Sequence, residues 1–221
     1  MVIAGREIGT AAGPARVEVE AGGAGFLLVL THGAGGGTTS ADLRAATRAG
    51  LDAGGVVVSV LQPYRVAGAR APGSAQRQDA AWLEIIGVLR AEHPGLPLVQ
   101  GGRSNGARLA CRTARAAGAA GVVALAFPLH PPGQAGVPEK SRAGELRGAG
   151  VPVLVVNGDR DPFGMPDARD ADRLVVLPGE THALSRNPGA IRDAVSVWLT
   201  RVVTGPAPSG RGPGKAGGPA T

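Results

Sequence analysis

Residues 96–112 read LPLVQGGRSNGARLACR, and this stretch decides how the rest of the chain is interpreted. A short apolar run leads into Gly102-Arg103-Ser104-Asn105-Gly106, and a helix-favouring segment rich in Ala, Leu and Arg follows. The pattern is Gly-x-Ser-x-Gly between a predicted strand and a predicted helix, the setting in which the motif forms a tight turn that exposes its serine. Glycine is needed on both sides because a side chain there would collide with the neighbouring strand or helix.

The motif alone is weak evidence in this chain. Glycine makes up 37 of the 221 residues, so a chance Gly-x-Ser-x-Gly is expected about 0.2 times. The interpretation therefore depends on what surrounds the motif and on partner residues elsewhere.

The surrounding sequence predicts alternating strands and helices. Continuous apolar runs, such as FLLVL at 26–30, are typical of strands buried on both faces of a parallel sheet. The expected strands are 15–20, 26–30, 56–61, 96–101, 121–127, 151–157 and 173–177. The expected helices are 41–53, 75–92, 105–117, 140–147 and 188–203. This alternation predicts an α/β fold with a mostly parallel sheet of about six to seven strands and helices on both faces.

Composition narrows the class of protein. The apolar content of 43% supports one domain over residues 1–203, with a core of Val, Leu and Ala because aromatics are only 3%. The net charge of +6 comes from scattered arginines without interleaved aromatics, so we expect no nucleic-acid partner. The single Cys111 cannot form an internal disulfide, and we expect it to pack as a small apolar residue.

The ends of the chain carry no targeting signal that we recognise. Residues 1–20 lack an apolar core behind basic residues, and no run approaches the length of a membrane span. We therefore expect a cytoplasmic protein without a membrane partner. Residues 204–221 are rich in Gly and Pro, which predicts a disordered tail. The oligomeric state is left open.

A serine hydroxyl becomes a nucleophile when a base takes its proton, and a third group must orient that base. His182, just beyond the last predicted strand, is the candidate base, with His130 in reserve. The acid is expected after the preceding strand, where Gly-Asp-Arg-Asp offers two carboxylates. We prefer Asp161, which has enough turn before it to swing back toward His182, and interpret Asp159 as a turn residue.

An oxyanion formed at an attacked carbonyl needs backbone N–H donors. The N–H of Asn105 at the helix N-terminus is the first candidate, and the N–H of Ala34 in the His-Gly-Ala-Gly-Gly loop is the second. That loop lacks the Gly-Lys-Ser/Thr ending of a P-loop and fails Gly-x-Gly-x-x-Gly, because Thr38 stands at the sixth position counted from Gly33. Nucleotide binding is therefore disfavoured, and no metal or organic cofactor is expected.

Further residues at the same edge of the predicted sheet are candidates for lining a substrate site. They are His32, Gly33, Tyr64, Arg65, Arg103 and His130. Each has a structural alternative: the histidines can brace loops, Tyr64 and Arg65 can tie loops together, and Arg103 can form a salt bridge. The sequence leaves these alternatives open.

In combination, these segments resemble an α/β-hydrolase over roughly residues 10–203. More narrowly, the chain is similar to the small branch called KANL/Tex hydrolase-like, which is related to dienelactone hydrolases. The matching stretches are THGAGG (31–36), QPYRVAGARAP (62–72), GGRSNGAR (101–108), AFPLHPPG (126–133), SRAGEL (141–146), GDRDPFG (158–164) and 179–182. The order Ser104, Asp161, His182 is the one that α/β-hydrolases use.

The resemblance implies the α/β-hydrolase fold and a triad at these three positions, and it names no substrate. About 23 residues separate the strands at 121–127 and 151–157, which leaves no room for a cap domain. The segment before the first His-Gly is short enough for the leading antiparallel strands of the larger fold to be missing. We expect a serine hydrolase of small acyl esters. The alternatives are a catalytically silent interaction protein, or an acyltransferase or peptidase with the same triad.

Overall fold

The computed structural model describes residues 2–205, and the side chains from residue 5 onward. Its strands are β1 (Val2–Ile8), β2 (Ala15–Ala21), β3 (Leu27–Thr31), β4 (Val56–Leu61), β5 (Leu98–Arg103), β6 (Gly121–Leu125), β7 (Val153–Gly158) and β8 (Arg173–Leu177). Its helices are α1 (Ala41–Asp52), α2 (Pro63–Val66), α3 (Ala75–Glu92), α4 (Asn105–Ala117), α5 (Ala143–Arg147) and α6 (Pro188–Thr204), with short 3₁₀ turns η1 (Pro138–Lys140) and η2 (Ala168–Asp170).

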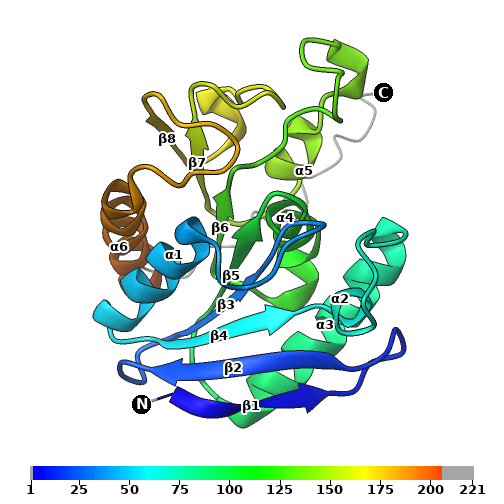
Figure 1. Ribbon diagram of the computed structural model, residues 1–221. Coiled ribbons are helices and arrows are strands. Elements are labelled where there is room, and N and C mark those ends of the chain that lie inside the picture. Colours follow the sequence, from blue (N-terminus) through cyan, green and yellow to red (C-terminus); the bar gives the residue numbers. More distant parts are fainter. Residues whose placement is uncertain (1, 206–221) are drawn as a thin grey trace, which may run out of the picture.

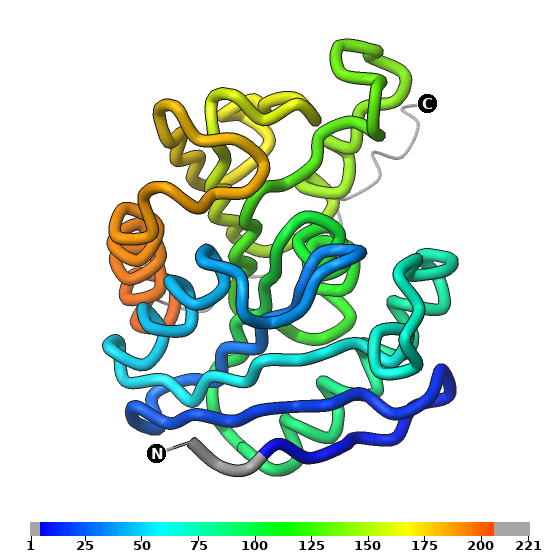
Figure 2. Tube along the Cα trace, viewed as in Figure 1, coloured from blue at the N-terminus to red at the C-terminus, as the bar shows by residue number. Residues whose placement is uncertain are grey.

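All eight strands lie in one sheet, in the order β1-β2-β4-β3-β5-β6-β7-β8 (Figure 1). The strands from β4 to β8 run parallel, whereas β1 and β2 are antiparallel to their neighbours. The Cα trace shows the β1–β2 hairpin at one edge and the β8 segment at the other (Figure 2). The expected α/β fold with a mostly parallel sheet is confirmed.

The expected number of strands was too low, and the leading antiparallel strands are present as β1 and β2. Sequence analysis overlooked β1 because its pairing with β2 shifts register between Ile3 and Arg6. Such an irregularity breaks the two-residue alternation by which a strand is recognised.

The inner strands are apolar throughout because both faces of the sheet are covered. On β3, Leu27 and Val29 belong to the core formed with α3, α4 and α5. The alternate residues Leu28 and Leu30 belong to the core formed with α1 and α6. Helices lie on both faces (Figure 1), and the site must therefore form at the ends of the strands.

The connection between β6 and β7 contains η1 and the short α5 and no other helix or strand. In this fully described stretch no cap domain is inserted, so the carboxyl ends of the strands stay open. Within residues 2–205, no helix is both long and apolar enough to cross a membrane. Of the tail predicted from residue 204, Thr204 still belongs to α6, and 206–221 lie outside the described residues.

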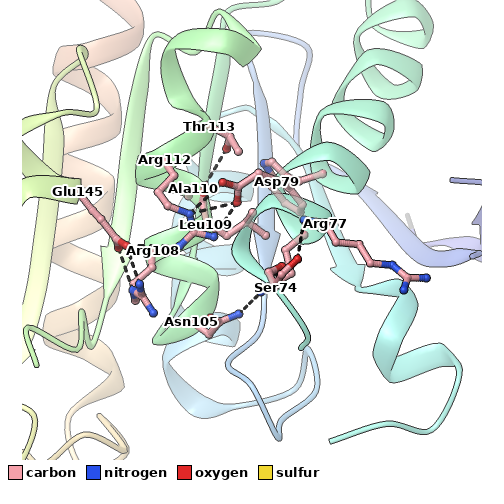
Figure 3. Close-up of polar contacts among 12 residues, drawn as sticks. Ser74, Arg77, Asp79, Asn105, Arg108, Leu109, Ala110, Arg112, Thr113 and Glu145 are labelled. Carbon is pink, nitrogen blue, oxygen red and sulfur yellow. Dashed lines mark hydrogen bonds and ion pairs between the residues drawn. The ribbon is translucent and has the colours of Figure 1, made fainter. Parts of the chain in front are cut away.

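A network of charged side chains fixes α4, the helix that follows Ser104, to the two helices beside it (Figure 3). Arg112 on α4 donates to Asp79 of α3 at 2.6 Å. Arg108 donates to both carboxylate oxygens of Glu145 on α5, at 2.8 and 2.6 Å. The side chains that form these pairs are 15–26% exposed, so the surrounding protein partly screens them from water. The network therefore fixes the position of α4, which begins directly after Ser104, relative to α3 and α5.

Replacing Arg112→Gln should lower the free energy of unfolding by about 2 kcal/mol. The substitution leaves the partly buried Asp79 carboxylate without its cation, whereas Glu145 keeps Arg108. Breaking a fully buried pair costs about 3–5 kcal/mol. The matched control is Arg169→Gln, in an ion pair whose arginine side chain is 89% exposed, where the change should stay within about 0.5 kcal/mol. Urea unfolding measures both. Equal effects of the two substitutions would show that the network does not stabilise α4.

Candidate active site

Ser104 sits at the turn between β5 and α4 in a strained backbone conformation. Its φ is 54° and its ψ is −114°, in the positive-φ region that residues other than glycine rarely adopt. Its N–H donates to the Leu125 carbonyl of β6 at 2.9 Å. This turn lifts the side chain beyond the end of the sheet, as the Gly-x-Ser-x-Gly motif predicts.

The glycines on either side of Ser104 are required by close approach of the backbone. A Cβ atom at Gly102 would lie 2.6 Å from the Thr31 carbonyl oxygen, and one at Gly106 would lie 2.7 Å from that of His32. Both contacts are shorter than real Cβ atoms make. The end of β3 therefore passes directly against the serine turn, which brings the loop after β3 to the nucleophile.

The structure brings Ser104, His182 and Asp161 together from the ends of β5, β8 and β7. The His182 Nε2 atom lies 2.9 Å from the Ser104 Oγ atom. The His182 Nδ1 atom lies 2.8 Å from Asp161 Oδ2. An ionised carboxylate only accepts hydrogen bonds, so Nδ1 carries the proton and Nε2 presents its lone pair to the serine hydroxyl.

Asp161 is held by the turn in which it lies. Its Oδ1 accepts from the Phe163 N–H at 2.9 Å, and its Oδ2 lies 3.5 Å from the Asn157 amide nitrogen. The Phe163 ring packs edge-on against the imidazole of His182, with centroids 4.4 Å apart. Asp159 instead accepts from the Gly179 N–H at 2.7 Å, so it acts as a turn residue away from His182.

Arg103, next to the serine, supports the loop that carries His182. Its Nε lies 2.8 Å from Oδ2 of Asp42, whose side chain is completely buried at the start of α1. Its Nη2 donates to the His182 carbonyl at 2.6 Å. Of the two roles left open for Arg103, the structure shows the salt bridge. Sequence analysis missed Asp42, for which the only signal was an acidic residue in the first turn of a helix.

Glu180 organises the same loop from inside and was also missed. Its side chain is buried, and its carboxylate accepts from the N–H groups of Ser185, Arg186 and Asn187 at 3.1, 2.7 and 2.7 Å. Three such bonds satisfy the buried side chain and fix the backbone of residues 185–187 around it. The signal available in the sequence was an acidic residue shortly before the Asn-Pro that begins α6.

The two candidate oxyanion donors lie on either side of Ser104. Asn105 begins α4, where an N–H has no partner within the helix. Ala34 follows Gly33, at which a Cβ atom would lie 3.2 Å from the Ser104 Cβ. Among the hydrogen bonds found within residues 2–205, none uses the backbone N–H of Ala34 or Asn105. Both donors are therefore available to an external acceptor.

His32 braces the loop after β3 and does not line the site. It is completely buried, its Nδ1 lies 2.8 Å from the Gly33 carbonyl oxygen, and its Nε2 accepts from the Gln62 N–H at 3.0 Å. Burial lowers the pKa of His32 below its ordinary value. The ring is therefore neutral, with its proton on Nδ1.

Tyr64 and Arg65 tie the same loop to α2. The Tyr64 hydroxyl donates to the Ala34 carbonyl at 2.8 Å, and Arg65 Nε donates to the Gly36 carbonyl at 2.9 Å. Burial raises the pKa of Tyr64 to about 12, which keeps the hydroxyl protonated as a donor. Of the two readings, the structure shows these side chains holding the loop.

His130 packs under the turn that contains Asp161. The backbone N–H of His130 donates to the Phe163 carbonyl at 2.9 Å. A Cβ atom at Gly164 would lie 2.8 Å from the ring Nδ1 of His130. With His182 occupying the position next to Ser104, the reserve base is not needed. Within the described residues, no group of three or more His, Cys, Asp or Glu side chains is arranged to hold a metal ion.

Substituting Gly102→Ala should cost about 1–3 kcal/mol of stability, the usual effect of overpacking, because the new methyl group meets backbone that cannot move aside. The matched control is Gly87→Ala, on an exposed face of α3 where a Cβ atom meets nothing within 4 Å, and it should gain about 0.5–1 kcal/mol. Chemical denaturation of both proteins measures the difference. Similar stability of the two variants would contradict the close approach at the turn.

The neutral state of His32 predicts a pH-dependent stability. Below its ordinary pKa of 6.5, the unfolded chain binds a proton that the folded protein excludes until the lowered pKa is reached. The free energy of unfolding should therefore decrease as the pH is lowered through this window, by up to about 1.4 kcal/mol per pH unit. Above pH 6.5 the full contribution remains.

The measurement compares urea unfolding of the unmodified protein and His32→Gln at about pH 7.5 and about pH 5.5. The unmodified protein should lose more stability between the two conditions, because carboxylate titrations are common to both proteins. Parallel losses would show that His32 is not held neutral.

Comparisons with known proteins agree with this fold. Among solved structures, Est1E from Butyrivibrio proteoclasticus superposes with a TM-score of 0.74 at 13% identity, covering 91% of this chain and 99% of that one. XC6422 from Xanthomonas campestris, described as an α/β serine hydrolase without lid, gives 0.70 at 21%, covering 92% and 96%. Dienelactone hydrolase from Anabaena variabilis gives 0.66 at 16%, covering 89% and 98%.

At these identities the structural likeness shows the fold alone. No protein of curated function matches the chain in sequence. Residues 24–180, more than half of the chain, match the alpha/beta hydrolase domain family, and the match includes Ser104 and Asp161. The resemblance seen in the sequence is thus confirmed, and the chain belongs to the alpha/beta hydrolase domain family.

Proposed function

We propose that the protein is a serine hydrolase that cleaves carboxylic esters or related acyl bonds of small molecules. The observation that carries this proposal is the relay from Ser104 Oγ to His182 Nε2, 2.9 Å, and from His182 Nδ1 to Asp161, 2.8 Å. Hydroxyl, imidazole and carboxylate in this arrangement form the constellation that activates a serine for acyl transfer.

In the proposed reaction the Ser104 oxygen attacks the acyl carbon while His182 Nε2 takes its proton. The N–H groups of Asn105 and Ala34 would stabilise the negative oxygen that forms, and one such donor is commonly worth about 3–4 kcal/mol of barrier. His182 then returns the proton to the leaving alcohol. Water attacks the acyl-enzyme with the same histidine as base, which releases the acid and regenerates the serine.

Two further observations support hydrolysis of an ester over catalytic silence. The strained φ of Ser104 is kept by contacts that hold the hydroxyl in position, and such strain is concentrated at functional sites. The structural neighbour Est1E has also been solved with ferulic acid bound. Ferulic acid is a carboxylic acid, the class of product that ester hydrolysis releases.

A fluorophosphonate probe should label the folded protein at Ser104, and Ser104→Ala should abolish the labelling. Asp161→Asn should lower kcat on p-nitrophenyl acetate by about 10³–10⁴-fold, because His182 loses the group that sets its tautomer. Ser196→Ala on α6 serves as the matched control and should be labelled like the unmodified protein. Mass spectrometry of the labelled peptide and the rate of p-nitrophenol release are the measurements.

Absence of labelling in correctly folded protein would contradict the proposal and favour an interaction protein with a silent hydrolase fold. Faster acyl transfer to an added alcohol or amine than to water would instead indicate an acyltransferase. Cleavage of peptides without cleavage of esters would indicate a peptidase.

A further inference from the structure

A cavity of about 270 Å³ lies beside the carboxyl end of β4, between α2 with the loop after it and the first turns of α3. Tyr64 and Ala67 form one wall, Gln78 and Ala81 form the opposite wall, and Trp82 also lines it. The helices α2 and α3 lie on one side of the molecule, whereas the loops after β7 and β8 lie on the other (Figure 1). The triad itself does not line this cavity.

Two lining side chains connect the cavity directly to the candidate oxyanion donors. The Tyr64 hydroxyl donates to the carbonyl of Ala34 at 2.8 Å. The Gln78 Oε1 accepts from the Asn105 side-chain amide at 2.7 Å. Both residues whose N–H groups flank Ser104 are thus hydrogen-bonded to the cavity wall, which places the cavity next to the point of attack.

The polar atoms of the wall are already engaged with the protein. The Gln78 amide nitrogen donates to the carbonyls of Gly73 and Ser74, and the Gln62 amide nitrogen donates to the Thr31 hydroxyl. The Trp82 ring nitrogen donates to Gln100. The remaining lining is mostly Ala, Pro and Ile. Arg77 brings a charge to the rim, where it extends from α3 away from Asn105 (Figure 3). Such a wall suits an apolar group, since a polar one would find few free partners.

The strand order determines which part of an ester reaches the cavity. Along the sheet edge the order is β4, β3, β5, β6, β7, β8, so the cavity and His182 lie on opposite sides of Ser104. In the tetrahedral intermediate the leaving oxygen must face His182 Nε2 to receive its proton, and the oxyanion must face the N–H donors. The acyl substituent is left to point away from His182, toward β4.

We infer that this cavity binds the apolar acyl group of the substrate, an inference that rests on the proposed ester hydrolysis. A dry apolar cavity of about 150 Å³ holds benzene, so this cavity has room for a phenyl ring or a short alkyl chain. Long acyl chains exceed it, because pockets for larger ligands span about 300–1,000 Å³. The substrate class is therefore an ester of a short or aromatic apolar acid, with the alcohol part in the open region by His182.

The test measures the ratio of kcat/KM for p-nitrophenyl hexanoate to that for p-nitrophenyl acetate. Each buried CH₂ group is worth about fourfold, so burial of at least two of the four additional CH₂ groups should give the unmodified protein a ratio of about tenfold or more. Ala81→Leu extends a larger side chain into the cavity from the α3 wall and should reduce the ratio to near one. Ala80→Leu, one position earlier on the exposed side of α3, is the matched control and should keep both rates.

A second variant covers the case in which Ala81→Leu does not fold. Ala71 lines the cavity from an exposed loop position, and Ala71→Trp should narrow the entrance and lower the same ratio by at least about threefold. Fluorophosphonate labelling of Ser104 is measured on every variant in parallel. Absence of labelling in the unmodified protein overturns the proposed function, and with it the substrate class.

Labelling with an unchanged acyl-chain ratio in both variants overturns the cavity inference alone. A further arm holds the acetyl group constant and compares ethyl acetate with hexyl acetate. If Ala81→Leu alters this alcohol preference and leaves the acyl preference unchanged, the cavity binds the alcohol and the inference is wrong. The expected result is the reverse pattern.

Discussion

The close approach of the β3 end to the turn between β5 and α4 is the constraint on which the site depends. A Cβ atom at Gly102 would lie only 2.6 Å from the Thr31 carbonyl oxygen, and one at Gly106 only 2.7 Å from the His32 carbonyl oxygen. Because glycine has no side chain at these two positions, the end of β3 can approach closely, and the loop after it lies directly beside Ser104. The same contact therefore goes with two features at once: the positive φ of Ser104, and the proximity to it of the loop that carries the unused Ala34 N–H.

The rest of the site maintains this contact from several directions. The loop after β3 is held by the buried ring of His32 and by two side chains of α2, Tyr64 and Arg65. Arg103 links the serine turn to Asp42 of α1 and to the carbonyl of His182. The distance between Ser104 and His182 thus depends on a salt bridge to α1, which packs on the opposite face of the sheet from α4. Side chains that the sequence offers as substrate contacts are thus parts of the supporting structure, and Tyr64 in addition lines the cavity beside β4.

The order of elements and the serine turn were predictable from sequence because both are local. A strand, a glycine-flanked serine and a helix follow one another within residues 96–117. The two glycines indicate a turn in which a side chain would collide with the neighbouring backbone. Asp161 was preferred over Asp159 from turn length alone, and the structure places it against His182. By contrast, Asp42 meets Arg103 through tertiary approach, and nothing in its neighbouring residues indicates that partner. Glu180 bonds to N–H groups five to seven residues further along the same loop, in a turn that has no recognisable sequence pattern. The strand β1 escaped prediction because an irregular pairing conceals its alternation.

The same geometry determines which strand end carries each group of the candidate site. Asp161 and His182, the proposed acid and base, lie after β7 and β8, and Ser104, the proposed nucleophile, lies after β5. The loop after β3 supplies one oxyanion candidate, and the space beyond β4 is lined mostly by apolar side chains. Because no cap covers the edge, α2 and α3 are the elements that can exclude water from part of a substrate. A binding group placed there shares its walls, through Tyr64 and Gln78, with the residues that flank Ser104. On the inference drawn above, an apolar group in that space would exclude water from both hydrogen bonds and so strengthen them, which would link acyl binding to the positioning of the candidate oxyanion donors.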